Sequence, residues 1–76
     1  MSNMQELNLE RLLCPMPVIK TQNKLRSMQS GETLKVICTD RGTMHDIPAW
    51  CKVNGFKLIK AEATNDTKFE FIIEVK

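Results

Sequence analysis

The sequence predicts a small α/β domain in which strands and helices follow one another in the order βαβαββ. Two periodicities indicate this class: apolar residues alternate with polar ones in four segments and recur at helical spacing in two others. Turn-forming residues separate these segments, among them Gly31, Gly42 and Gly55. A length of 76 residues allows a single domain, residues 1–76, with one small hydrophobic core.

The first strand is expected over about residues 6–13, where leucines alternate with polar residues. A helix should follow, because the next apolar residues share one helical stripe: Val18, Leu25 and Met28. Pro17 is a suitable start, since the N–H groups of a first helical turn have no partners within the helix. The helix is expected to end near residues 30–31, where glycine can supply a left-handed cap.

The second strand is expected over residues 33–39, and the loop after it over residues 40–43. A second helix then has two possible starts. Asp46 can be its N-cap with Pro48 in the first turn, or Thr43 and Asp46 can form a capping box. The helix should end at Asn54-Gly55, and its buried stripe is expected to contain Ile47, Trp50 and Cys51.

Two final strands are expected over residues 56–63 and 68–75, joined by the turn-rich segment 64–67. The last strand is apolar on nearly both faces, with Ile72 opposite the apolar face of Phe69, Phe71 and Ile73, which favours a central position antiparallel to its neighbours. A strand, helix and strand connect in parallel with right-handed crossover, so the first two strands should end at the same edge of the sheet. Cys14, the loop at residues 40–43 and the final hairpin are all expected at that edge, where open α/β sheets bind ligands.

Cys14 lies between the predicted first strand and first helix, in the segment Leu13-Cys14-Pro15-Met16-Pro17. The two prolines restrict the backbone around it and favour a helix start immediately after it. A helix N-terminus carries a partial positive charge, which stabilises a thiolate relative to a thiol. Since the thiolate is the nucleophilic form, Cys14 is the candidate reactive residue.

Composition narrows the remaining function classes. The chain is 42% hydrophobic and 26% charged, and its net charge of +2 comes from interspersed residues, so charge gives no sign of a nucleic-acid partner. Three cysteines without a C-x-x-C pair and a single histidine suggest neither disulfides nor a metal site, and no cofactor is expected. Without a signal-peptide pattern or an apolar run that spans a bilayer, the expected location is the cytoplasm and no membrane contact is expected.

Several motifs together resemble the TusA/SirA-like family of small sulfur carriers over about residues 7–75. The motifs are Cys14-Pro15-Met16-Pro17-Val18-Ile19-Lys20, Gly31-Glu32, Asp46-Ile47-Pro48 and Gly55-Phe56. The resemblance implies a two-layer α/β sandwich with a four-stranded mixed sheet and two helices on one face. It also implies that the cysteine accepts sulfane sulfur as a persulfide and relays it. In the family the donor is a cysteine desulfurase or a rhodanese, and acceptors serve tRNA thiolation or sulfur oxidation.

This chain departs from the family pattern at two places near Cys14. Asn8 and Arg11 stand where members usually have aspartate and glycine, and Asp40-Arg41-Gly42 replaces a loop that commonly reads Asp-Pro. Both changes add positive charge at the expected thiol edge. The residues expected to support Cys14 or to bind a partner are Pro15, Pro17, Lys20, Arg11, Asp40, Arg41 and Asp46.

Lys20, with Arg11 or Arg41, could stabilise the sulfur anion or steer an acidic partner, and Lys24 is expected in the same cluster. Cys38 and Cys51 are expected to be small core residues. Two alternatives to a monomeric sulfurtransferase-type carrier stay open: an RNA-binding module, since the fold resembles the C-terminal domain of translation initiation factor three, and a redox regulatory adaptor in which Cys14 senses oxidants.

Overall fold

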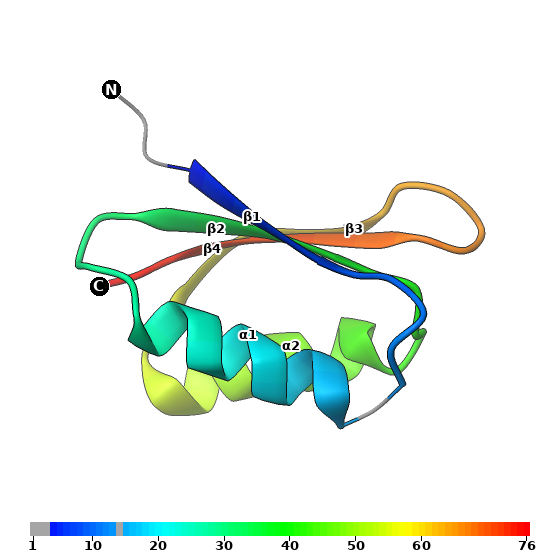
Figure 1. Ribbon diagram of the computed structural model, residues 1–76, viewed down its shortest axis with the longest axis horizontal. Helices are drawn as coiled ribbons and strands as arrows, with labels where there is room; N and C mark the ends of the chain where they lie inside the picture. Colours follow the sequence, from blue (N-terminus) through cyan, green and yellow to red (C-terminus); the bar gives the residue numbers. More distant parts are fainter. Residues whose placement is uncertain (1–3, 14) are drawn as a thin grey trace.

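Four strands and two helices alternate along the chain in the predicted order (Figure 1). The structure is a computed structural model that describes residues 4–13 and 15–76; Cys14 lies outside the described residues. The elements are β1 (Met4–Leu9), α1 (Met16–Arg26), β2 (Thr33–Cys38), α2 (Thr43–Asn54), β3 (Lys57–Ala63) and β4 (Phe69–Glu74).

The strands form one mixed sheet with the order β1-β2-β4-β3. β1 and β2 are parallel, and β4 is antiparallel to both of its neighbours, β2 and β3. The predicted central position of the last strand is therefore confirmed. Both helices lie on the same side of the sheet, which gives the expected two-layer sandwich and leaves the other face of the sheet uncovered (Figure 1).

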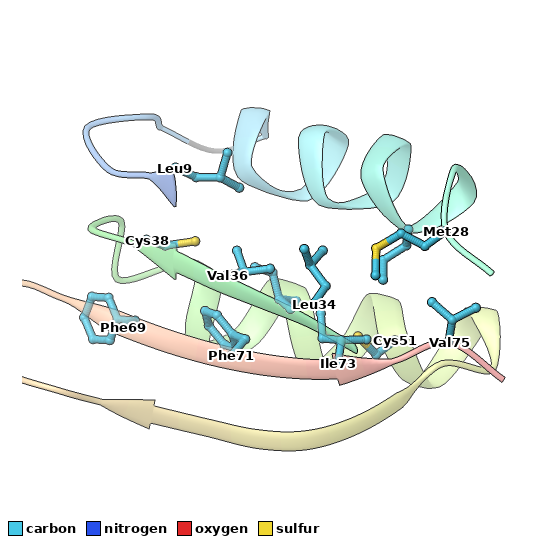
Figure 2. Close-up of a cluster of buried hydrophobic side chains, with 12 residues drawn as sticks. Leu9, Met28, Leu34, Val36, Cys38, Cys51, Phe69, Phe71, Ile73 and Val75 are labelled. Carbon is cyan, nitrogen blue, oxygen red and sulfur yellow. The ribbon is translucent and has the colours of Figure 1, made fainter. Parts of the chain in front are cut away.

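The core lies between the helices and the inward face of β2 and β4. Alternate residues of these strands are buried, and Leu34, Val36, Cys38, Phe71 and Ile73 are fully so, as the period of two predicts (Figure 2). The helices contribute fewer apolar side chains to this core: Pro17 and Leu25 from α1, and Ile47 and Cys51 from α2. Val18 and Trp50, which were expected on the buried stripes of the helices, are only half-buried. The Trp50 ring packs against the edge of the core and stacks on Phe56, with ring centroids 5.1 Å apart.

The first strand ends at Leu9, four residues before its predicted end. Arg11 has a φ of 69°, a left-handed conformation that a strand cannot contain. The Asn8 side chain supports the turn, because its Oδ1 accepts the Glu10 N–H at 2.9 Å. Arg11 stands where the resembled family usually has glycine, and the backbone here adopts the conformation for which glycine is suited.

The predicted end of the first helix is wrong, whereas that of the second is right. α1 ends at Arg26, where short i to i−3 bonds from Ser27 and Met28 tighten the last turn. Gly31 is not a helix cap: it has a φ of 93° in the following turn and donates its N–H to the Val75 carbonyl at 2.7 Å. The end of α2 is confirmed, with Gly55 as a left-handed cap.

The start of α2 differs from both predicted alternatives. Asp46 lies inside the first turn and is not the N-cap, which is Gly42, and Pro48 is inside the helix. The Thr43 hydroxyl donates to the Asp40 carbonyl at 2.6 Å, so it does not act in a capping box. Asp40 organises the turn before the helix, since its Oδ1 accepts the Gly42 N–H at 3.0 Å and its carbonyl accepts the Thr43 N–H.

Replacing Arg11 with glycine should raise the free energy of unfolding by about 0.5–1 kcal/mol. A residue with a Cβ in the left-handed conformation destabilises the folded state by about 1–2 kcal/mol, and glycine removes this strain. Part of the gain is lost because glycine has more conformational freedom in the unfolded chain. Urea unfolding followed by circular dichroism measures the change. Arg11→Ala is the control, because it removes the guanidinium but keeps the Cβ; equal midpoints for the two variants would show that the backbone is not strained.

Candidate functional site

Three connections meet at the edge of the sheet where β1, β2 and β3 end. The Arg11 N–H donates to the Thr39 hydroxyl at 2.7 Å, which joins the β1–α1 connection to the loop after β2. Lys68, at the end of the β3–β4 hairpin, forms an ion pair with Glu10 at 2.9 Å. This ion pair and the Asn8 amide lower the pKa of the Glu10 carboxyl. The edge expected to carry Cys14 is thus assembled from segments far apart in the sequence, at the right of Figure 1.

The described residues on both sides of Cys14 are held close together. The Met16 N–H donates to the Leu13 carbonyl at 2.9 Å, and the Ile19 N–H donates to the Pro15 carbonyl at 3.1 Å. Pro15 is the N-cap residue of α1 and is exposed, whereas Pro17 is buried against the core within the first turn. The two prolines therefore have different roles: Pro17 anchors the helix start, and Pro15 leads the chain into it.

The N-terminus of α1 is electropositive for two reasons. Its first turn contains no acidic residue, so no carboxylate offsets the partial charge of the helix end. Lys20, the fifth residue of the helix, is exposed. An anion next to this helix start would therefore be stabilised electrostatically.

Arg11 and Arg41 lie at the same edge, on two of the connections that meet there, and both are exposed. Among the described residues, the salt bridges involve Lys35, Lys60 and Lys68, and not Arg11, Lys20 or Arg41. The Arg11 charge helps to lower the pKa of the neighbouring Glu10 carboxyl. Lys24 was wrongly expected in this cluster: it lies in the last turn of α1, at the other end of the helix. Asp40 and Asp46 are both half-buried near the start of α2, where Asp40 holds the loop.

Three exposed apolar residues are close to Cys14 in the sequence. Leu13 is 73% exposed, Met16 40% and Ile19 42%. Leu13 and Ile19 were not among the residues expected at the site. A sequence signal existed for Ile19, because it is not on the apolar stripe of Val18, Leu25 and Met28.

The other two cysteines are core residues, as expected. Cys38 and Cys51 are 0% and 1% exposed, and burial raises the pKa of each thiol to about 11. In Cys38 a hydrogen bond with Thr43 opposes the shift in part. Both thiols therefore stay protonated and covered at neutral pH, which makes them poor nucleophiles and poor resolving partners.

Two other kinds of feature, a metal-binding group and a membrane-spanning helix, are absent from the described residues. Within residues 4–13 and 15–76, no group of three or more histidine, cysteine, aspartate or glutamate side chains could hold a metal ion. No helix in the same ranges is long and apolar enough to cross a membrane. The uncovered face of the sheet mixes both signs of charge, and Glu70 lies between Lys35 and Lys60 at 3.7 Å and 3.5 Å.

Comparison with known proteins points to one family. The family model described as "Sulfurtransferase TusA" matches residues 5–75. A putative sulfur carrier protein of Aquifex aeolicus is 40% identical over 75 residues; the match covers 95% of this chain but only 38% of that protein's length. The sulfur carrier protein TusA of Allochromatium vinosum is 37% identical, and the match covers 92% of this chain and 91% of that protein.

A solved structure has a similar fold. The crystal structure of a SirA-like protein from Desulfitobacterium hafniense superposes with a TM-score of 0.83, covering 93% of this chain and 96% of that one. The sequence identity is 17%, so this likeness concerns the fold alone.

At pH 7–8 the folded protein should take up one equivalent of iodoacetamide, on Cys14. With pKa values of about 11, the buried thiols are ionised in about one molecule in a thousand at pH 8. The Cys14 pKa is expected below the ordinary value of about 8.5, given the adjacent helix N-terminus. Peptide mapping after labelling across a pH series measures both quantities, and urea should expose the other two cysteines. Labelling of Cys38 or Cys51 in the folded protein at the rate of Cys14 would contradict the assignment.

Proposed function

This chain belongs to the TusA family of sulfurtransferases, and we propose that it is a sulfur carrier that holds sulfane sulfur as a persulfide on Cys14. The observation that carries the proposal is the setting of Cys14 in the sequence. It directly precedes the N-cap residue of α1, a helix whose first turn has no acidic residue, while the other two thiols are sealed in the core. Cys14 is then the thiol suited to form a nucleophilic thiolate.

The proposed transfer needs no cofactor and no net oxidation. The Cys14 thiolate attacks the outer sulfur of a donor persulfide, the donor's sulfur–sulfur bond breaks, and the donor cysteine leaves as a thiolate. The outer sulfur, still carrying its proton or negative charge, is now bonded to Cys14. An acceptor thiolate then attacks the same sulfur, and Cys14 leaves as a thiolate. The positive end of α1 favours this leaving group as it favours the attacking anion.

The partners in this proposal are a donor such as a cysteine desulfurase or a rhodanese, and an acceptor in tRNA thiolation or in sulfur metabolism. The cytoplasm, where thiols stay reduced, suits a relay between such proteins. Since the chain spans just over a third of the Aquifex relative, its activity and partners are proposals for this chain in its own right.

The two alternative functions have less support. RNA recognition by a sheet uses basic and aromatic side chains on its open face, but Phe69 and Phe71 face the core and glutamates offset the lysines of the open face. An oxidant sensor of the two-cysteine kind needs a resolving thiol, and Cys38 and Cys51 are buried. Both observations favour the carrier over these alternatives.

Incubation with a cysteine desulfurase and cysteine should add one sulfur atom, about 32 Da, to the intact protein through persulfide formation. Cys14→Ser should abolish this addition, whereas Cys51→Ala should retain it because the Cys51 thiol is buried. Mass spectrometry before and after reduction with dithiothreitol measures the loading. Loading of the Cys14→Ser protein to the wild-type level would reject Cys14 as the carrier residue.

Reversing the exposed charges at the thiol edge, Lys20→Glu with Arg41→Glu, should slow transfer from an acidic donor about tenfold at low salt. Electrostatic steering raises the association rate and is screened beyond about 8 Å at physiological ionic strength. Time courses of sulfur transfer from the donor, quenched at intervals and measured at 20 and 500 mM salt, give the transfer rates. Lys52→Glu with Lys57→Glu is the matched control, because it changes the net charge equally at the opposite end of the molecule. Equal slowing of both double variants would mean that overall charge, and not this edge, sets the rate.

A further inference from the structure

The Thr39 hydroxyl joins two connections that are far apart in the sequence. Thr39 directly follows Cys38, the last residue of β2, and its Oγ1 accepts the Arg11 N–H at 2.7 Å. Cys38 is 0% exposed and pairs with Leu9 on one side and Phe69 on the other, so Thr39 extends from a fixed point in the sheet. Arg11 lies in the turn after β1. The hydrogen bond therefore ties this turn to the rigid part of the molecule.

The turn at Arg11 is held weakly by its own contacts. Arg11 has a φ of 69°, which is strained for a residue with a Cβ and which turns normally reserve for glycine or asparagine. The bond that closes the turn, from the Leu12 N–H to the Leu9 carbonyl, is long at 3.3 Å. Leu12 packs against the core, but apolar contact is non-directional and does not fix the peptide at Arg11. Without the Thr39 hydroxyl, the backbone can relax away from the left-handed conformation.

A second tie from this turn depends on charge. Glu10, next to Arg11, forms an ion pair with Lys68 at 2.9 Å, and the Lys68 and Glu10 side chains are 48% and 29% exposed. Exposed ion pairs contribute little, because water and salt screen them. The Asn8 side chain bonds to Glu10, within the turn itself. Among the contacts of the described residues, the Thr39 hydroxyl is thus the neutral bond that fixes the turn to the end of β2.

Resting on the proposed function, we propose that Thr39 is a positioning residue for sulfur transfer: its hydroxyl holds Arg11 in the left-handed conformation and so sets the direction in which the chain continues to Cys14. Cys14 follows Arg11 by three residues, and each residue spans up to about 3.5 Å, so a changed φ at Arg11 can displace the thiol by several ångströms. A misplacement of about 1 Å is enough to slow a reaction strongly. Thr39 acts here through the backbone and not as a catalytic residue.

The test replaces the Thr39 hydroxyl with a methyl group at constant charge. Thr39→Val keeps the shape of the side chain, Thr39→Ser keeps the hydroxyl, and Thr33→Val makes the same change at the other end of β2. The Arg11 N–H is at the surface, where water can replace the lost acceptor, so the variants should stay folded. All three substitutions leave the charged groups of this edge in place, among them Glu10, Arg11, Asp40, Arg41 and Asp46. A change in the pKa of Cys14 then has a positional cause.

Thr39→Val should take up sulfur about fivefold more slowly, both from a cysteine desulfurase and from sodium polysulfide, whereas Thr39→Ser and Thr33→Val should keep the wild-type rate. With the desulfurase the loss should fall on kcat and not on KM, because the proposed defect lies in the thiol and not in donor binding. Iodoacetamide labelling across a pH series should place the pKa of Cys14 nearer the ordinary value of about 8.5 in Thr39→Val than in the wild type. A lower urea midpoint with unchanged rates and an unchanged pKa would overturn the proposal, by making Thr39 a stabilising residue only.

Two further backgrounds test whether the hydroxyl acts through the backbone of Arg11. In an Arg11→Gly protein, Thr39→Val should have little effect, because glycine adopts the left-handed conformation without strain. In an Arg11→Ala protein the loss of about fivefold should remain, since alanine keeps the Cβ. Equal losses in the two backgrounds would overturn the proposed route. Failure of the wild type to load sulfur from any donor would instead reject the proposed function, while the labelling series would still test the effect of Thr39 on Cys14.

Discussion

Burial of one face of β2 and β4 beneath both helices is the constraint on which the rest of the structure depends. In a chain this short, β2 and β4 together supply more of the buried apolar side chains than either helix does. Because side chains in a strand alternate, burying Leu34, Val36 and Cys38 fixes which residues face outwards. The order and directions of the strands then determine which connections meet at the thiol edge.

The site is a product of those connections. Parallel pairing of β1 with β2 brings the start of α1 beside the start of α2, and antiparallel pairing of β3 with β4 brings the hairpin to the same edge. The hydrogen bond from Arg11 to Thr39 and the ion pair of Glu10 with Lys68 then join the three connections. The core supplies the geometry and keeps Cys38 and Cys51 buried and protonated, which is consistent with the proposal that Cys14 is the carrier residue.

The fold could be predicted from the sequence because its signals are local and strong: alternation in β2 and β4, helical spacing around Leu25 and Ile47, and glycine at the end of α2. The errors fall where tertiary contacts decide. Gly31 bonds to Val75 instead of capping α1, and Asp40 replaces Asp46 as the residue that organises the start of α2. At the site, the proline spacing around Cys14 indicated a helix start correctly. The exposure of Leu13 was beyond sequence reasoning, because an apolar residue near a strand end is usually buried.

The position of β4 has a consequence for the synthesis of the protein. Among the strands, β4 comes last along the sequence yet lies between β2 and β3 in the sheet. Neither β2 nor β3 can therefore pair with β4 until residues 69–74 have left the ribosome. Up to that moment the nascent chain can pair β1 with β2 at most, and the apolar inward face of β2 lacks its main contacts. The four-stranded sheet therefore forms late in synthesis, when β4 pairs with β2 and β3. An interrupted translation product that lacks β4 would expose two unpaired strand edges and become a target for chaperones and proteases.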